Sequence, residues 1–157
     1  MRDVKQNERP SALLFDGSII RSSLSFNGQN LINHSHLWWP APYINDTSLT
    51  DVFTPQNQYE DFMTDPKWMD KVIMRSPIRI DFDAEKETEK HPLVHMHTQN
   101  YETRLHVDEP ICFSKFMKYI FQNFYPEIEL EYQKWNLLSF SYRKPRVLQH
   151  DFSSIVL

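Results

Sequence analysis

The residues with the clearest chemical potential in this chain are histidines and aspartates that recur two positions apart. Side chains two apart on a β-strand project from the same face, so each pair is expected to share a face wherever its segment is a strand. Imidazole and carboxylate groups held together in this way suit metal binding or proton transfer. The pairs are His34 with His36, Asp81 with Asp83, and His95 with His97.

A metal site is one chemistry that this set predicts. His95, His97 and Asp81 would bind a divalent transition metal such as zinc, manganese or nickel, because neutral imidazole and carboxylate suit those ions. The expected catalytic residues are His95, His97, Asp81 and Asp83. The expected pocket or supporting residues are His34, His36, His91, His106, Arg79 and Arg104. No cofactor is certain, since His-x-His is less specific than HExxH or paired CxxC motifs.

Three other interpretations of the same histidines stay open. Imidazoles can take and give protons near neutral pH, and RNA cleavage through the 2′-hydroxyl needs little more than that and a cation such as Arg79 or Arg104. A closed metal site would stabilise the fold without catalysis. Ordinary surface or buried histidines would have neither role.

The segments that carry these residues are expected to form strands. Apolar runs around Asp16-Gly17, a second turn at 26–29 and the alternating run 30–39 predict a three-stranded meander. In the third strand, the two sets expected on opposite faces are Leu31, Asn33, Ser35, Leu37 and Ile32, His34, His36, Trp38. In the run 78–83 they are Ile78, Ile80, Phe82 and Arg79, Asp81, Asp83. Residues 91–98 and 102–107 predict a hairpin across 99–101.

One strong helix completes the predicted fold. Apolar residues recur at helical spacing over about 113–125, ahead of Pro126. Strands in runs with one such helix indicate an α+β fold, a mostly antiparallel sheet with the helix packed on one face and the other face free for a site or a partner. We expect a flexible tail at 1–10, one domain at 11–157, a long loop at 43–65 and a short helix opening at Asp65-Pro66. Periodicity does not settle 127–157.

Composition narrows the function classes. The 157 residues include 40% hydrophobic and 14% aromatic residues, enough for a core, but only 2 glycines, which argues against P-loop and GxGxxG nucleotide sites. The net charge of −4 gives no general attraction for nucleic acid, so such binding would need a local basic patch. A single cysteine, Cys112, and the lack of a signal or membrane-spanning run predict a cytoplasmic protein.

Between residues 79 and 125 the chain resembles a bacterial domain-of-unknown-function family, number twenty-two ninety. The resemblance rests on Arg-x-Asp-Phe-Asp at 79–83, His-Pro-x-x-His-x-His at 91–97, and an apolar helix introduced by Pro110 and ending in Phe124-Tyr125. It covers about a third of the chain and implies no assigned reaction. The histidine-bearing strands also look like those of small toxins of bacterial toxin–antitoxin pairs.

Two functions follow as hypotheses from different classes. The first is a histidine-dependent phosphodiesterase or ribonuclease that acts in antiphage defence or in a toxin–antitoxin pair. The second is a non-catalytic subunit of such a complex, which would bind a protein encoded nearby or a second copy of itself through aromatic residues. Membrane partners are not expected.

Overall fold

The computed structural model describes residues 10–42, 64, 66, 70, 73–100, 102–128, 130–131, 134–135, 137 and 139–146. Its strands are β1 (Ala12–Leu13), β2 (Ile19–Asn27), β3 (Asn30–Trp39), β4 (Ile78–Asp83), β5 (Val94–Thr98), β6 (Leu105–His106) and β7 (Ser141–Tyr142). The helix is α2 (Phe113–Phe124). Residues 1–9 of the tail predicted at 1–10, nearly all of the loop predicted at 43–65 and most of the short helix predicted after Asp65 lie outside the described residues.

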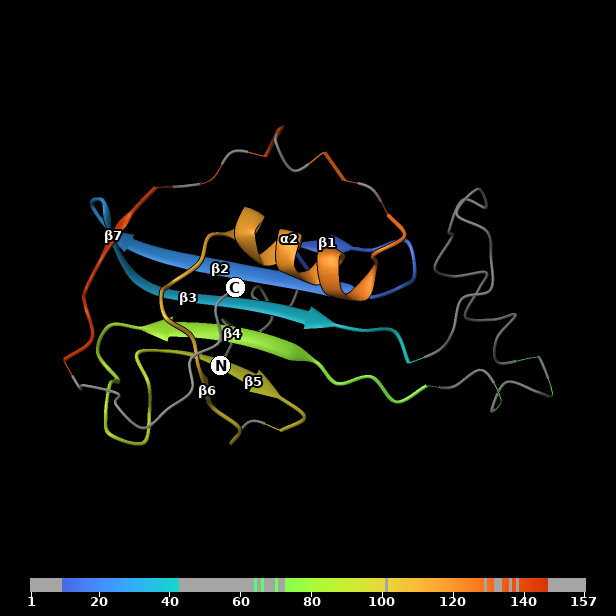
Figure 1. Ribbon diagram of the computed structural model, residues 1–157, viewed down its shortest axis with the longest axis horizontal. Helices are drawn as coiled ribbons and strands as arrows, with labels where there is room; N and C mark the ends of the chain where they lie inside the picture. The colour runs from blue at the N-terminus through green and yellow to red at the C-terminus, as the bar shows by residue number, and fades with distance from the viewer. Residues whose placement is uncertain are drawn as a thin grey trace, which may run out of the picture.

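The strands form one seven-stranded sheet with α2 on one face, which confirms the α+β prediction. The order is β1-β2-β3-β4-β5-β6 with antiparallel neighbours, and β7 pairs in parallel with the start of β3. In Figure 1, α2 runs along the β1 to β3 side of the sheet, and β4, β5 and β6 extend beyond it. Within the described residues, no helix has the length and apolar character needed to cross a membrane.

Two glycine turns build the predicted meander of β1, β2 and β3. Gly17 has φ 84° and Gly28 has φ 62°, a region that a residue without a Cβ enters at little cost. The first turn is closed by the Leu14 amide, which donates to the Ser18 carbonyl at 2.8 Å. The second leaves only Gly28 and Gln29 between β2 and β3, so these strands pair from the turn at Asn27 and Asn30 to their far ends at Ile19 and Trp39.

The core lies between α2 and one face of the sheet. Alternate residues of β4, namely Ile78, Ile80 and Phe82, are buried there, as the sequence predicted. The helix buries Phe116, Met117, Ile120 and Phe121 against them and ends at Phe124, with Tyr125 as its C-cap. The predicted helix at about 113–125 is therefore confirmed.

A β-bulge corrects the predicted alternation at the start of β3. Ser25 pairs with Asn33, but Phe26 pairs with Leu31, so Ile32 has no partner on β2. Because Ile32 is an extra residue in β3, the side chain before it projects to the opposite face from the one that simple alternation predicts. Leu31 is therefore buried in the core, rather than lying with Asn33 and Ser35 on the other face as the simple period predicted.

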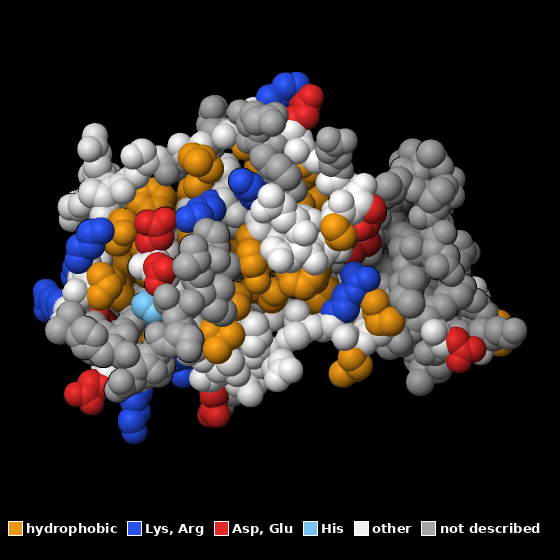
Figure 2. All heavy atoms as spheres, viewed as in Figure 1, with side chains coloured by type: hydrophobic (Ala, Val, Ile, Leu, Met, Phe, Trp, Pro, Cys, Tyr) orange, Lys and Arg blue, Asp and Glu red, His pale blue; other side chains and the backbone are white. Residues whose placement is uncertain are grey.

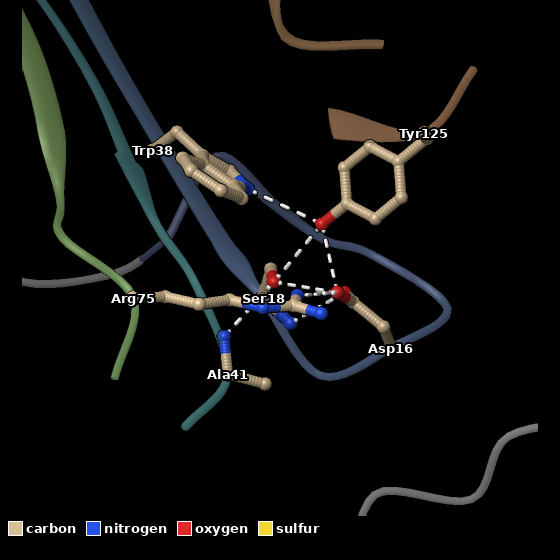
Figure 3. Close-up of polar contacts among 6 residues, drawn as sticks. All are labelled: Asp16, Ser18, Trp38, Ala41, Arg75 and Tyr125. Atoms are coloured by element: carbon tan, nitrogen blue, oxygen red, sulfur yellow. Dashed lines mark hydrogen bonds and ion pairs between the residues drawn. The ribbon is translucent and has the colours of Figure 1, made fainter. Parts of the chain in front are cut away.

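A buried polar network joins the first turn to the end of α2 (Figure 3). The Asp16 carboxylate accepts hydrogen bonds from the Ser18 amide at 2.9 Å and from the Tyr125 hydroxyl at 2.8 Å. Arg75 forms an ion pair with it at 3.3 Å, and Trp38 Nε1 donates to the Tyr125 hydroxyl at 3.3 Å. Burial raises the pKa of the Tyr125 phenol, which therefore stays a donor to Asp16. The network fixes the helix end to the sheet.

Removing the central carboxylate should destabilise the fold. In Asp16→Ala, buried donors of Ser18 and Tyr125 lose their acceptor, and we expect the free energy of unfolding to fall by about 2–4 kcal/mol. Urea unfolding followed by circular dichroism measures the change. The exposed Asp108→Ala serves as control and should change stability by less than about 0.5 kcal/mol. Equal effects of the two substitutions would contradict this role of Asp16.

Candidate functional site

The strand pairing places the predicted catalytic residues on the face of the sheet opposite α2. Asp81 on β4 lies directly across from His95 on β5 and from Ser35 on β3. Arg79 lies directly across from His97 in the same way. Directly opposed residues of antiparallel strands project from the same face. The alternation of β4 and β5 therefore gathers these side chains on the side that α2 does not cover, which we call the open face.

A pocket of about 390 Å³ lies on the open face. Its wall combines histidines, carboxylates and cations. It includes most of the residues that the sequence predicted for the site. The lining residues are Asn33, His34, Ser35, Arg79, Asp81, Phe82, Asp83, Lys86, His91, His95, His97 and Arg104. His106 is not part of the wall, although it lies directly opposite His95 on β6.

Asp81, His95 and His97 form the centre of the site. Each offers one donor atom, and the three atoms lie within 4.8 Å of one another. The Asp81 carboxylate is oriented by the Ser35 hydroxyl, which donates to its Oδ1 at 2.7 Å. Its Oδ2 lies 2.8 Å from Arg79 Nε and 3.4 Å from His97 Nε2. A carboxylate and two imidazoles in this arrangement can bind a transition metal or exchange protons.

The backbone fixes the orientation of His95. Its Nδ1 lies 2.9 Å from the Pro92 carbonyl oxygen, which can only accept, so Nδ1 carries the proton. Burial lowers the pKa of His95 to about 4, and burial followed by the Arg79 charge lowers the pKa of His97. Both imidazoles are therefore neutral near pH 7, and His95 presents the lone pair of Nε2 rather than a proton.

A loop between β4 and β5 carries further residues into the pocket. The His91 ring lies 4.4 Å from that of His95, measured between centroids. Lys86 forms an ion pair with Asp83 at 3.1 Å. Glu87 attaches this loop to the segment after β7. Its buried carboxylate pairs with Arg143 at 2.8 Å and accepts a hydrogen bond from the Arg146 amide. The segment after β7 thus supports the wall of the site.

His34 and His36 were expected to complete this pocket, and the structure corrects that expectation. They lie directly opposite Phe82 and Ile80, so their imidazoles share the core face with these side chains. Both are fully buried, and the His36 ring stacks on Phe116 of α2 at 5.4 Å. His34 belongs to the pocket wall, but its ring packs against that of Phe82 at 5.8 Å between centroids.

The two buried imidazoles bind the backbone N–H and C=O groups of one residue, Ile111, in the segment that leads into α2. The Ile111 amide donates to His34 Nε2 at 3.2 Å, and His36 Nε2 donates to the Ile111 carbonyl oxygen at 3.0 Å. The Ser22 hydroxyl lies 2.8 Å from His36 Nδ1 and donates to it in that tautomer. These histidines therefore replace a strand partner for Ile111 and anchor the helix, which is a structural role.

Sequence reasoning missed Ser35, Asn33 and Lys86 as pocket residues. The alternation of β3 had already placed Asn33 and Ser35 on the face opposite His34. The sequence pattern does not tell which face of β3 lies on the same side as Asp81. The pairing of Ser35 with Asp81 in the structure shows that it is the face of Asn33 and Ser35.

The chain belongs to a family of uncharacterized conserved proteins, DUF2290, whose model matches residues 2–155. The match confirms the family that the sequence resembles and extends it over almost the whole chain. No curated protein and no solved structure matches the chain.

Stability should fall as the pH drops below neutral because of the buried histidines. Burial, with the His36 charge, lowers the pKa of His34 from 6.5 to about 3. Below pH 6.5 His34 is therefore protonated in the unfolded chain but stays neutral in the folded protein. Between pH 7 and pH 5 this difference alone lowers the free energy of unfolding by about 2 kcal/mol. His34→Gln keeps an acceptor for the Ile111 amide but cannot titrate. Urea unfolding at both pH values should show a smaller loss for the variant, and equal losses would contradict the assignment.

Proposed function

We propose that this member of the DUF2290 family is a phosphodiesterase that cleaves RNA at the pocket of Asp81, His95 and His97. The observation that carries the proposal is the composition of one pocket wall. Three cationic side chains, Arg79, Lys86 and Arg104, surround the buried imidazoles on the open face. A phosphodiester needs both parts, cations that hold its oxygens and groups that activate the attacking oxygen.

Arg104 is the cation best placed to bind a phosphate. Arg79 and Lys86 each face a carboxylate, Asp81 and Asp83 respectively. Within the part of the chain that the structure describes, Arg104 pairs with no carboxylate; it donates through one guanidinium nitrogen to the Glu102 carbonyl at 3.1 Å. Its remaining donors can form the two parallel bonds that a guanidinium makes to phosphate oxygens.

The local charge of the pocket offsets the acidity of the whole chain. The net charge is −4, and on the face shown in Figure 2 acidic and basic side chains are intermixed rather than separated into a basic surface. Attraction of a polyanion must therefore come from the pocket itself, where Arg79, Lys86 and Arg104 outnumber Asp81 and Asp83. We expect weak general affinity for RNA and cleavage that depends on contacts at the pocket.

The cellular setting that we propose is the bacterial cytoplasm, in antiphage defence or a toxin–antitoxin pair. The support for the compartment is chemical: the single cysteine, Cys112, is a buried free thiol at the start of α2 and forms no disulfide within the chain. The support for the setting is the likeness of the histidine-bearing strands to those of small toxins.

Cleavage of a labelled single-stranded RNA by the purified full-length protein tests the proposed activity. We expect His95→Ala and Asp81→Asn to lower kcat/KM about 100-fold or more, because each removes a group at the reacting atoms. Arg104→Ala should cost about 10-fold or more, mainly through weaker phosphate binding.

Lys115→Ala is the matched control for a lost cation, because Lys115 lies on α2 and pairs with Glu109 outside the pocket. It should cleave like the wild type. Intact RNA with wild-type protein, or full activity in both His95→Ala and Asp81→Asn, would contradict the proposal. Circular dichroism confirms that each variant is folded.

A second function, protein binding without catalysis, is favoured by an exposed apolar row at the other end of the open face. Leu13 pairs with Ile19, and Ile19 with Trp39, so the three side chains share that face. They are 47%, 37% and 57% exposed. The adjacent Trp38, by contrast, is buried against α2, so of this neighbouring pair only Trp39 is available to a protein partner.

The binding function predicts an assembly that depends on Trp39. Light scattering after size exclusion should give more than one chain per particle, or a complex with the co-expressed product of a neighbouring gene. Trp39→Ser should dissociate it by removing an exposed aromatic contact. Leu137→Ser is the control, since Leu137 is 69% exposed and lies outside the row. A monomer that binds no neighbouring product would contradict this second function.

A further inference from the structure

We infer that Asp81, His95 and His97 together hold one divalent transition-metal ion on the open face of the sheet. The inference deepens the proposed phosphodiesterase by naming its cofactor, and it rests on the same pocket. It stands on the positions of the donor atoms, on the groups that orient them, and on the chemistry of the donor set.

The distances fit metal ligands better than a hydrogen bond. His97 Nε2 and Asp81 Oδ2 are 3.4 Å apart. That separation is longer than a good N–H···O bond, which spans about 2.7–3.2 Å. Two donors that each bind a zinc-like ion at about 2.1 Å with tetrahedral angles lie about 3.4 Å from each other. The His95 donor is within 4.8 Å of both, so a modest side-chain rotation brings it to bonding distance.

Two of the three ligands are oriented by groups that do not themselves bind the ion. The Pro92 carbonyl fixes the Nδ1 proton of His95, and the Ser35 hydroxyl donates to Asp81 Oδ1. Such outer partners set the tautomer and direction of metal ligands in proteins. They leave Nε2 of His95 and Oδ2 of Asp81 for the ion.

The donor set selects a class of ion. Two neutral imidazoles and one carboxylate suit zinc, manganese, cobalt, nickel or iron(II), whereas calcium and magnesium prefer oxygen ligands alone. Three protein ligands also leave coordination positions for water or a phosphate oxygen, which is the arrangement of catalytic rather than structural sites. The pocket beside these ligands has the room for such an oxygen.

Arg79 is the competitor of the ion. Its Nε lies 2.8 Å from the same Asp81 Oδ2, and its side chain is 39% exposed, so it can move away into the pocket. Because Arg79 neutralises the ligand carboxylate, its removal should strengthen metal binding. A salt bridge that serves only the fold predicts no such gain.

Metal binding by the full-length protein tests the inference without reference to activity. After treatment with EDTA and its removal, we would titrate cobalt(II) and follow the visible d–d absorption, then displace it with zinc(II). We expect one equivalent of cobalt(II) per chain. The double variant His95→Ala/His97→Ala and the single variant Asp81→Asn should each weaken binding about 100-fold or more. Arg79→Gln should bind at least as tightly as the wild type.

His36→Gln is the matched control, because it removes a buried histidine that lies on the core face of the same sheet and outside the pocket wall. It should keep the stoichiometry of one. Less than about 0.1 equivalent in the wild type, or unchanged affinity in the folded double variant, would overturn the inference. Metal binding without RNA cleavage would support it and contradict the phosphodiesterase. Cleavage by metal-free protein that takes up no cobalt would support the phosphodiesterase and overturn the metal site.

Discussion

The antiparallel register of β3, β4 and β5 is the constraint on which both faces of this protein depend. Asp81 points to the open face opposite His95, while the next residue, Phe82, enters the core opposite His34. A slip of one residue in β4 would bury Asp81 and expose Phe82 and Ile80, and burying each apolar side chain contributes about 1.5–3 kcal/mol. The hydrophobic core therefore fixes the position of the Asp81 carboxylate, although this carboxylate lies on the other side of the sheet.

The same residue type has opposite roles on the two faces. His36 satisfies both ring nitrogens with Ser22 and Ile111, so its polar groups are fully used in anchoring the segment before α2. His95 uses one nitrogen on the Pro92 carbonyl and keeps the other for the pocket. Burial lowers the pKa of both imidazoles, so neutrality alone does not mark a functional histidine. The second nitrogen, and what it faces, makes the distinction.

Alternation and helical spacing predicted most of the fold, because apolar residues that recur every two or every 3.6 positions can be recognised within a short stretch of sequence. Residues 78–83 and the stripe from Phe113 behave as their patterns require. The burial of His36 under α2 could not be predicted in this way. Its partner Ile111 lies 75 residues away, and the period tells which side chains share a face but not which face α2 covers. The bulge at Ile32 and the two-residue strand β7 could not be predicted either, because each involves too few residues to produce a periodic pattern.

The Asp81 carboxylate connects the proposed ion to the proposed substrate. Its Oδ2 faces Arg79 and His97, and a guanidinium 2.8 Å from this oxygen disfavours coordination of a divalent cation beside it, because the two positive charges repel. An ion would therefore displace Arg79 from Asp81. The released guanidinium stays in the wall of the same pocket, where a phosphate oxygen is the partner that restores its neutralisation. Ion and phosphodiester would thus favour each other's binding, and without the ion Arg79 neutralises the Asp81 carboxylate.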